Sequence, residues 1–375
     1  MSSTGSPTAQ ARARAPGRDR ILLMSSNGAG MGHLTRLLAY AAHLPPEVEP
    51  YVLSLSQAVP LVGQFGYRYE YLPSHGALGM APTGWEALFE ERLHEVVGRV
   101  QPRVVVFDGA HPYRGMDRVR SAYPDTRWVW SRRGMWRPGR GRDQLAKSAW
   151  FEEVIEPGDL AAASDRGASA SAPAYRVDPV TLTGREHLVE REVARGELGL
   201  PADGLLGLIA LGAGNINDTS TQVGAAAAVL RAAGCAVAVT DVAIAETTSA
   251  TDVHLVRAYP LAPYFSAFDI VISAAGYNSF HELLRLGVPS VFIPNADTAT
   301  DDQVARATHA AQQGWARMVP SATDPQLADA VRLMLAHGAD LAAAAMAADP
   351  GNGARAAAAR VLEVMAAPRR ERLER

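Results

Sequence analysis

The feature that most constrains this chain is a pattern that occurs twice: a short apolar run, a glycine-rich turn, and a stretch in which apolar residues recur at helical spacing. The first copy is ILLMSSNGAGMGH at residues 21–33, and the second is GLIALGAGNINDTS at residues 207–220. Strands that alternate with helices in this order form parallel sheets covered by helices. The pattern therefore predicts an α/β protein with two sheets.

The same alternation continues along both halves of the chain. In the first half, apolar runs predict strands at Ile21–Ser25, Tyr51–Leu55, Val104–Phe107 and Trp128–Ser131, with helices at Leu34–His43 and Trp85–Val97. In the second half, the predicted strands are Leu206–Leu211, Ala236–Thr240, Ile270–Ser273 and Pro289–Ile293, and the predicted helices are Glu186–Leu200, Thr219–Ala233 and Ala354–Ala366.

The length of 375 residues also fits two domains, at roughly 150 residues each. We expect a disordered tail at 1–19, a Rossmann-like domain at 20–180, a second Rossmann-like domain at 181–352, and a terminal helix and tail at 353–375. Ligands of such sheets bind at the carboxyl ends of the strands. Two such domains that face each other would therefore hold their ligands in the cleft between them.

Composition excludes several classes of protein. The net charge of −3 argues against a nucleic-acid partner, because phosphates select basic surfaces. The single cysteine, Cys235, lies in an apolar run and is expected to be a buried strand thiol; it allows no intrachain disulfide. The first twenty residues lack the apolar core of a secretory signal, and no apolar stretch is long enough to predict a transmembrane helix. We therefore expect a cytoplasmic protein.

The segment at 273–307, SAAGYNSFHELLRLGVPSVFIPNADTATDDQVARA, carries the most information about a site. Its first strand ends at Ser273, Gly276 allows a tight turn, and a helix is predicted to begin near Asn278 and Ser279. The free N–H groups of a helix start attract anions. The alternative is a capping box, in which Ser279 caps the helix and Glu282 reaches back to the backbone without binding a ligand. From these residues alone the capping box is the commoner arrangement.

A second helix start follows at Thr300-Asp-Asp-Gln303, with acidic residues where the helix dipole favours them. The buried strand VPSVFIP joins the two helix starts. Both can therefore face the same cleft at the same edge of the second sheet.

Together these residues resemble a known signature. Gly276-Tyr-Asn-Ser279, Glu282, Gly287-Val-Pro289, Pro294 and Asp302-Gln303 are similar to the nucleotide-sugar motif of the GT-B glycosyltransferases. The similarity is to the plant UDP-glycosyltransferase box and to the carboxyl-terminal domain of the MurG-like, family 28 enzymes. It covers about 35 residues closely, and the two-domain layout extends it loosely over nearly the whole chain.

The resemblance implies a role for each matching residue. It places the donor diphosphate on Gly276, Asn278 and Ser279, the ribose on Glu282, the transferred sugar on Asp302 and Gln303, and the base near Ala258. Three positions depart from the plant pattern: Ala274 replaces a phosphate-binding His, the base-stacking Trp falls near Val256, and Arg306 replaces an Asn. These departures leave the base open, with a UDP-sugar the expected donor and no metal or other cofactor implied.

The first glycine-rich loop, Asn27-Gly-Ala-Gly-Met-Gly-His33, is weak evidence by itself, because it could equally be a dinucleotide fingerprint. The next strand, however, leads into Ser56-Gln57, where a nicotinamide-binding domain requires an acid on the ribose. The loop instead resembles the acceptor loop of GT-B enzymes, with Gly30 and Gly32 beside the acceptor and His33 facing the cleft.

His33 is the candidate general base, since an imidazole with a pKa near ~6.5 suits the removal of a proton from an acceptor hydroxyl. Asp108, which follows a strand, is the candidate partner that orients His33, as the matching Asp does in the plant enzymes. The alternatives are a helix cap for Asp108 and an ordinary helix-start residue for His33.

Two further segments have more than one interpretation. The turn with Gly212, Gly214 and Asn215 is either a tight turn or a second contact to the donor diphosphate. The segment Arg127–Arg142, RWVWSRRGMWRPGRGR, has six Arg and no acid. It is a surface for a phosphorylated or lipid-linked acceptor, a peripheral membrane contact, or a buried strand followed by a solvated loop. A membrane contact would use Arg132, Arg133, Trp136 and Arg137.

These observations predict a hexosyltransferase-type enzyme that moves a sugar from a nucleoside diphosphate donor to a small-molecule or lipid-linked hydroxyl acceptor. Inversion at the sugar is implied by the resemblance together with a single-displacement base. Two alternatives stay open. One is a nucleotide-sugar isomerase of the 2-epimerase type, and the other is a non-catalytic module that binds a nucleotide sugar.

Overall fold

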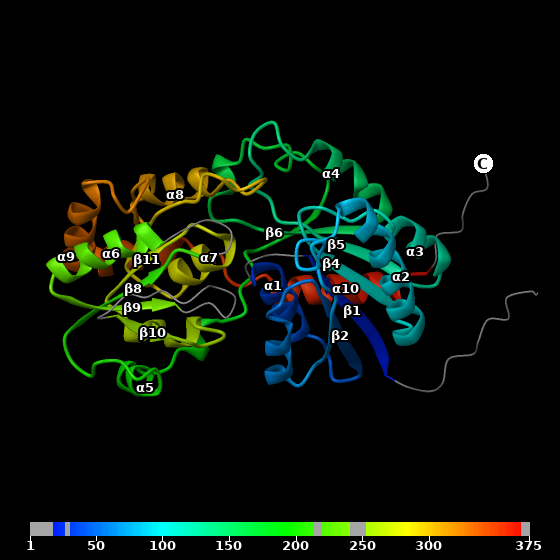
Figure 1. Ribbon diagram of the computed structural model, residues 1–375, viewed down its shortest axis with the longest axis horizontal. Helices are drawn as coiled ribbons and strands as arrows, with labels where there is room; N and C mark the ends of the chain where they lie inside the picture. The colour runs from blue at the N-terminus through cyan, green and yellow to red at the C-terminus, as the bar shows by residue number, and fades with distance from the viewer. Residues whose placement is uncertain (1–17, 27–30, 213–219, 241–252, 369–375) are drawn as a thin grey trace, which may run out of the picture.

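The computed structural model of this chain describes residues 18–26, 31–212, 220–240 and 253–368 (Figure 1). Within these ranges the chain forms two sheets whose strands are all parallel. The first sheet has the strand order β3-β2-β1-β4-β5-β6-β7, and the second has the order β10-β9-β8-β11-β12-β13. Both orders reverse direction beside the first strand of the domain, which is the place where sheets of this kind bind ligands.

The first domain uses helices on both faces of its sheet. Its strands are β1 Asp19–Ser25, β2 Val48–Ser54, β3 Arg68–Tyr71, β4 Val104–Asp108, β5 Arg127–Ser131, β6 Glu153–Pro157 and β7 Tyr175–Val177. Its helices are α1 Gly32–Ala41, α2 Pro82–Val100, α3 Met116–Ala122 and α4 Arg142–Ala146, with short 3₁₀ turns at Val59–Phe65, Lys147–Trp150 and Ala162–Ser164.

Successive residues of β1 show how this sheet is covered. Ile21 and Leu23 pack into the core beneath α1, whereas Leu22 and Met24 pack on the opposite face beneath α2. Side chains alternate across a strand, so a strand buried on both faces reads as one continuous apolar run. This is why β1 and β4 are recognisable in the sequence.

The second domain repeats this construction. Its strands are β8 Leu205–Ala210, β9 Cys235–Thr240, β10 His254–Val256, β11 Ile270–Ser273, β12 Ser290–Phe292 and β13 Arg317–Met318. Its helices are α5 Arg191–Glu197, α6 Ser220–Ala232, α7 Tyr277–Arg285, α8 Gln303–Gln312 and α9 Gln326–Ala348, with 3₁₀ turns at Arg185–His187 and Ala262–Ala267. By length and composition α9 could cross a membrane. Here it packs against the strands β11 and β12 and the helix α6 of the second domain.

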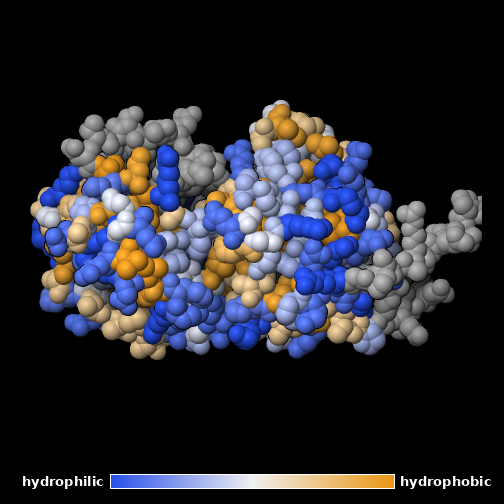
Figure 2. Space-filling model, turned by 90° about the horizontal axis from the view of Figure 1, so that it is seen from below, coloured by the Kyte–Doolittle hydropathy of each residue, from blue (hydrophilic) through white to orange (hydrophobic). Residues whose placement is uncertain are grey.

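The last helix, α10 Ala354–Ala366, belongs in space to the first domain. It packs against α1 and against β4 to β7 (red in Figure 1). Gly353 makes this return possible, because a Cβ there would lie 2.1 Å from the Asp178 carbonyl oxygen. The two domains form two lobes with a hollow between them, and hydrophilic residues cover most of the face seen in Figure 2.

The structure confirms the eight predicted strands and most of the helices. The strands that the sequence did not predict, β3, β6, β7, β10 and β13, lie toward the sheet edges, and all but one have four residues or fewer. The predicted helix Glu186–Leu200 is wrong as a single element. It divides into a 3₁₀ turn and α5 because Leu188 is extended and Val189 donates to the Pro263 carbonyl. The predicted boundary after residue 180 falls between β7 and β8.

The packing of α1 leads to a first prediction. Leu37→Ala should lower the free energy of unfolding by about 2–5 kcal/mol, because Leu37 is fully buried against β1 and its truncation leaves a cavity. Urea denaturation followed by circular dichroism measures the change. Val193→Ala is the control, since Val193 on α5 is 51% exposed and should change stability little. Equal effects of the two variants would contradict this account of the core.

Candidate functional site

The first part of the site lies at the carboxyl ends of β1 and β4. His33 stands at the start of α1, and its Nδ1 lies 2.6 Å from Oδ1 of Asp108, the last residue of β4. Asp108 is fully buried, whereas the side chain of His33 is 18% exposed. The Asp108 carbonyl accepts a hydrogen bond from the Ser26 amide at the end of β1. The structure thus brings together the two residues predicted as base and partner.

Arg36 is a third member of this group that the sequence analysis missed. Its Nε and Nη2 approach the two carboxylate oxygens of Asp108 at 3.1 and 2.5 Å. Ser131 at the end of β5 also donates to Asp108, over 2.7 Å. Arg36 and His33 are three residues apart on one helix, which places them on the same face. That spacing is the signal that could have identified Arg36.

The charges in this group determine its protonation. Burial raises the pKa of Asp108, but the Arg36 charge and the His33 hydrogen bond outweigh burial and bring it to about 2. Burial lowers the pKa of His33 below its ordinary value of 6.5; Asp108 opposes this, and Arg36 and Arg133 reinforce it. At neutral pH the group therefore holds a carboxylate, a guanidinium and a neutral imidazole.

The second part of the site is the amino-terminal end of α7. The helix begins at Tyr277, with Gly276 as its N-cap residue, and makes no side-chain capping hydrogen bond. Ser279 is therefore the third residue of the helix and does not cap it, so the capping box with Glu282 is not formed. This removes the structural alternative for Glu282.

Glu282 is partly buried on α7, and its side chain has no hydrogen-bond partner among the residues that the structure describes. Burial raises the pKa of its carboxyl group from 4.5 to about 8, although Arg285 opposes the shift. The charge of Glu282 raises the pKa of Tyr259, which places Glu282 near the segment that contains Ala258. The predicted ribose residue therefore lies within electrostatic range of Tyr259, which follows the predicted base residue Ala258 in sequence.

Asn278 connects α7 to the first domain. Its Nδ2 donates to the Gly32 carbonyl over 3.3 Å, and its Oδ1 accepts from Arg36 Nη1 over 3.4 Å. A further contact joins the hydroxyls of Thr35 and Tyr259, 2.9 Å apart. The helix start predicted to bind diphosphate therefore lies directly beside the turn that carries His33.

The third part is the start of α8. Asp302 caps the helix, because its Oδ1 accepts from the Ala305 amide. Gln303 accepts from the Asn295 amide through Oε1, and its Nε2 lies 3.9 Å from where a Cβ on Gly276 would stand. A cavity of about 380 Å³ opens beside both side chains and is also lined by Arg137 and Arg140 of the first domain.

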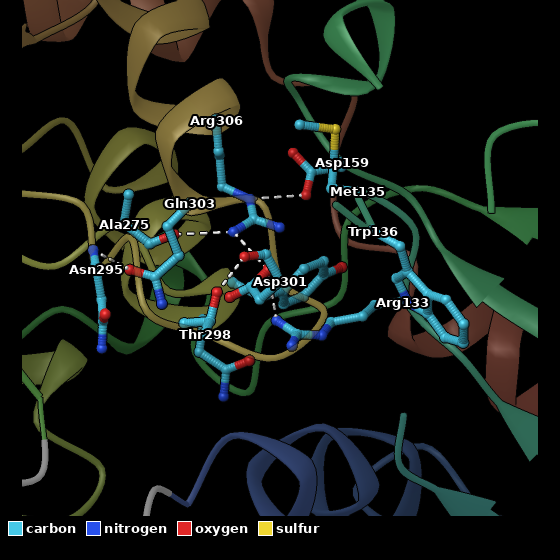
Figure 3. A network of polar contacts seen from close by, with 12 residues as sticks. Arg133, Met135, Trp136, Asp159, Ala275, Asn295, Thr298, Asp301, Gln303 and Arg306 are labelled. Carbon is cyan, nitrogen blue, oxygen red and sulfur yellow. Dashed lines mark hydrogen bonds and ion pairs between the residues drawn. The ribbon is translucent and has the colours of Figure 1, made fainter. Parts of the chain in front are cut away.

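A buried ion network holds this loop against the first domain (Figure 3). Arg306, which is fully buried, donates to Asp159 over 2.9 Å and to the Ala275 carbonyl over 2.8 Å. Asp301 Oδ1 lies 3.0 Å from Arg306 Nη1 and 2.8 Å from Arg133 Nη1. Arg306, which appeared in the sequence only as a departure from a pattern, is thus the centre of the junction between the domains.

The same junction corrects the interpretation of Arg127–Arg142 as a membrane-facing surface. Arg132 and Trp136 are buried, and Arg132 pairs with Glu156 at 2.5 Å. Arg133 pairs with Asp301, and Arg137 donates to the carbonyls of the loop at 296–298. Those side chains are therefore occupied inside the protein. The third interpretation was a buried strand followed by a solvated loop. The strand β5 is buried as expected, but in the loop that follows it only residues 138–140 are exposed.

The remaining predicted residues are placed as follows. Gly212 follows β8 with a φ of +98°, which favours glycine, and Ala258 follows β10 at the carboxyl edge of the second sheet. Gly30, Gly214 and Asn215 lie outside the described residues, as does most of the predicted tail at 1–19. Within the described ranges no group of three or more His, Cys, Asp or Glu could hold a metal ion. The expectation of a metal-independent reaction stays a prediction.

Comparison with known proteins agrees with this geometry. Residues 238–361 match the family model for the glycosyltransferase family 28 C-terminal domain. No curated protein matches the chain by sequence. Among solved structures, glycosyltransferase VinC in complex with dTDP has 15% identity and a TM-score of 0.62, over 92% of this chain and 99% of VinC.

Two further structures show the same likeness. MurG of Acinetobacter baumannii has 17% identity and a TM-score of 0.57, over 92% of this chain and 99% of MurG. The spinosyn rhamnosyltransferase SpnG, complexed with thymidine diphosphate, has 18% identity and a TM-score of 0.61, over 92% of this chain and 100% of SpnG. The chain therefore has the GT-B fold of two facing Rossmann-like domains.

The buried network leads to a prediction on stability. Arg306→Met should lower the free energy of unfolding by about 3–5 kcal/mol, because it leaves Asp159 and Asp301 buried without their shared cation. Differential scanning calorimetry and urea denaturation measure the loss. Arg332→Met is the matched control, because Arg332 is 68% exposed in its pair with Asp329 and should change stability little. A loss no greater than that of the control would refute the role of Arg306.

The raised pKa of Glu282 leads to a prediction on pH. A carboxyl group whose pKa is higher in the folded state favours folding below pH 4.5, and this contribution is lost as the pH rises through about 8. Glu282→Gln should therefore raise the melting temperature relative to the wild type at pH 9 and not at pH 4. Glu192→Gln, on the exposed surface of α5, should show no such dependence. A Glu282→Gln effect that is equal at both pH values would contradict the shift.

Proposed function

We propose that this chain, which has the GT-B fold and whose carboxyl-terminal domain matches glycosyltransferase family 28, transfers a sugar from a nucleoside diphosphate donor to a hydroxyl acceptor. One observation carries the proposal. The His33–Asp108 pair of the first domain lies against the amino-terminal end of α7 in the second, through the hydrogen bond from Asn278 to the Gly32 carbonyl. The candidate base, His33, and the helix start proposed to bind the diphosphate therefore lie side by side.

On the donor side, the diphosphate would lie at the start of α7, where free N–H groups and the positive end of the helix dipole favour negative charge. Gly276 has no side chain, so a phosphate could approach the backbone closely there. Gln303 Nε2 lies beside this position and could donate to the phosphate. The cavity next to Asp302 and Gln303, at about 380 Å³, has room for one sugar ring. Glu282 would accept hydrogen bonds from the two ribose hydroxyls.

On the acceptor side, His33 would act as the general base. In the tautomer that carries the proton on Nδ1, this nitrogen would donate to Asp108 Oδ1, and the lone pair of Nε2 would be free to take the acceptor hydroxyl proton. The acceptor oxygen forms a bond to the anomeric carbon as the bond from that carbon to the diphosphate oxygen breaks. The electron pair leaves with the diphosphate, whose charge the N–H groups of α7 would stabilise. A single displacement of this kind inverts the anomeric carbon.

The proposed donor carries a pyrimidine base. The sequence favours UDP, whereas two of the similar structures hold thymidine diphosphate. Both are pyrimidine nucleoside diphosphates, and the departures at Ala274 and Val256 fall at positions that contact phosphate and base in the plant motif. We therefore propose a pyrimidine nucleoside diphosphate sugar as the donor.

A thermal-shift panel of UDP, dTDP, GDP and ADP tests the donor site. The matching diphosphate at about 100 times its dissociation constant should stabilise the folded protein by about 2.7 kcal/mol and raise the melting temperature. Glu282→Ala should weaken this shift, because the ribose loses its acceptor. If none of the four nucleotides raises the melting temperature, the donor site is assigned wrongly.

His33→Ala tests the transfer step separately from donor binding. It should keep the nucleotide shift and lower the rate of sugar transfer to a panel of hydroxyl acceptors by about 10²–10⁴-fold, because the base is lost. Coupled detection of released nucleoside diphosphate measures the rate. A transfer rate equal to that of the wild type would remove His33 from the mechanism.

A further inference from the structure

Arg36 on α1 is buried, and several side chains contact its guanidinium group. It is 3% exposed, and its guanidinium carbon lies 5.1 Å from the centre of the Tyr277 ring. Its nitrogens approach three side chains: both oxygens of Asp108, His33 Nδ1 at 2.8 Å, and Asn278 Oδ1 at 3.4 Å. One guanidinium therefore contacts the candidate base, its carboxylate partner and the start of α7.

We propose that Arg36 is a positioning residue for the transfer reaction: it fixes the Asp108 carboxylate, keeps the His33 imidazole neutral, and ties this pair to Asn278 of the other domain. The inference deepens the proposed function and rests on it for the identity of the reaction. The protonation of His33 can nevertheless be measured without donor or acceptor. The two proposals can therefore fail separately.

Hydrogen bonds from several sides fix the orientation of the Asp108 carboxylate. Asp108 Oδ2 accepts from Ser131 and from Arg36 Nε, and Oδ1 accepts from Arg36 Nη2 and faces His33 Nδ1. These contacts occupy both oxygens of a side chain that is fully buried. The carboxylate therefore cannot turn, and His33 is held with Nδ1 toward Asp108 and Nε2 away from it.

The charge of Arg36 also controls the protonation of His33. A buried carboxylate requires a cation nearby, and without Arg36 the nearest group able to supply one is the His33 imidazole, by taking up a proton. Arg36 carries a permanent charge and already neutralises Asp108. His33 therefore stays unprotonated and ready to accept the proton of a hydroxyl. Without the Arg36 charge, a protonated His33 would be the cation that neutralises Asp108, and the pKa of His33 would rise.

The other groups around His33 support this account. The charged residues that face it are Asp108 on β4, Arg36 on α1 and Arg133 after β5. Arg133 is itself paired with Asp301 at 2.8 Å, so its charge is partly neutralised. Burial raises the pKa of both Tyr40 and Tyr277, which therefore stay neutral beside Arg36. Of the two arginines that face His33, Arg36 is the one that also donates to the Asp108 carboxylate.

Arg36 also contacts the second domain. Arg36 Nη1 donates to Asn278 Oδ1, while Asn278 Nδ2 donates to the Gly32 carbonyl, one residue before His33. The two hydrogen bonds fix the first turn of α7 against the first turn of α1. Arg36 thereby sets the position of the base relative to the proposed diphosphate site.

An NMR titration of the His33 imidazole in the free protein tests the inference, in the wild type, Arg36→Gln and Arg36→Lys. The wild-type midpoint should lie below 6.5. Arg36→Gln should raise it by about one pH unit or more, because the charge opposite Asp108 is lost. Arg36→Lys should leave it near the wild-type value, because the charge remains. A wild-type midpoint above 6.5, or no change in Arg36→Gln, would overturn the inference.

Arg133→Gln is the matched control, since Arg133 faces the same imidazole without contacting Asp108. It should raise the midpoint less than Arg36→Gln does, and an equal rise would overturn the special role of Arg36. If Arg36→Gln does not fold, the kcat of Arg36→Lys tests the positioning role of Arg36. Its kcat for sugar transfer should fall at least about tenfold at every pH, because a lysine cannot hold both carboxylate oxygens. An unchanged kcat would refute the positioning role, whereas a failure of nucleotide binding would refute the donor site and leave the titration result unaffected.

Discussion

The arrangement of the two domains depends on one buried cation. Arg306 on α8 is closed off from water and is shared by Asp159 of the first domain, Asp301 of the second, and the Ala275 carbonyl at the entry to α7. A charge in such a place is stable only when each partner stands where the geometry requires, because an unpaired buried ion costs several kcal/mol. The network therefore fixes the relative position of three chain segments that are distant in sequence.

The site follows from that junction. Asp301 also pairs with Arg133, and the next amide, that of Asp302, donates to the Met135 carbonyl of the first domain. These contacts bring the start of α8 to the edge of the cleft. On the other side of the cleft, Asn278 and Arg36 fix α7 to α1. The residues proposed for the donor and for the base thus reach each other through contacts that cross between the domains.

The sequence predicts those parts of the molecule in which local pattern and burial coincide. The central strands were predictable because burial on both faces requires continuous apolar runs. Local pattern placed His33, Asp108, Asn278 and Gln303 at strand ends or helix starts, but their roles came from the resemblance to the GT-B motif. Arg36 and Arg306 were not predicted as site residues, since their carboxylate partners lie 72 and 147 positions away. The basic segment at 127–142 was open to a membrane interpretation for the same reason, because Glu156 and Asp301 pair with Arg132 and Arg133 only in the folded chain.

Charge pairing also separates structural acids from the one proposed to bind a ligand. The buried carboxylates Asp108, Asp159 and Asp349 each have an arginine partner, and the pKa of each is lowered. Glu282 is different: its carboxyl group accepts no hydrogen bond from the described residues, and burial raises the pKa of this group to about 8. In this state the carboxyl group can still accept hydrogen bonds from donors on a bound ligand. Two vicinal hydroxyls are such donors, which is why the unpaired state of Glu282 supports a ribose at this position more directly than the motif does.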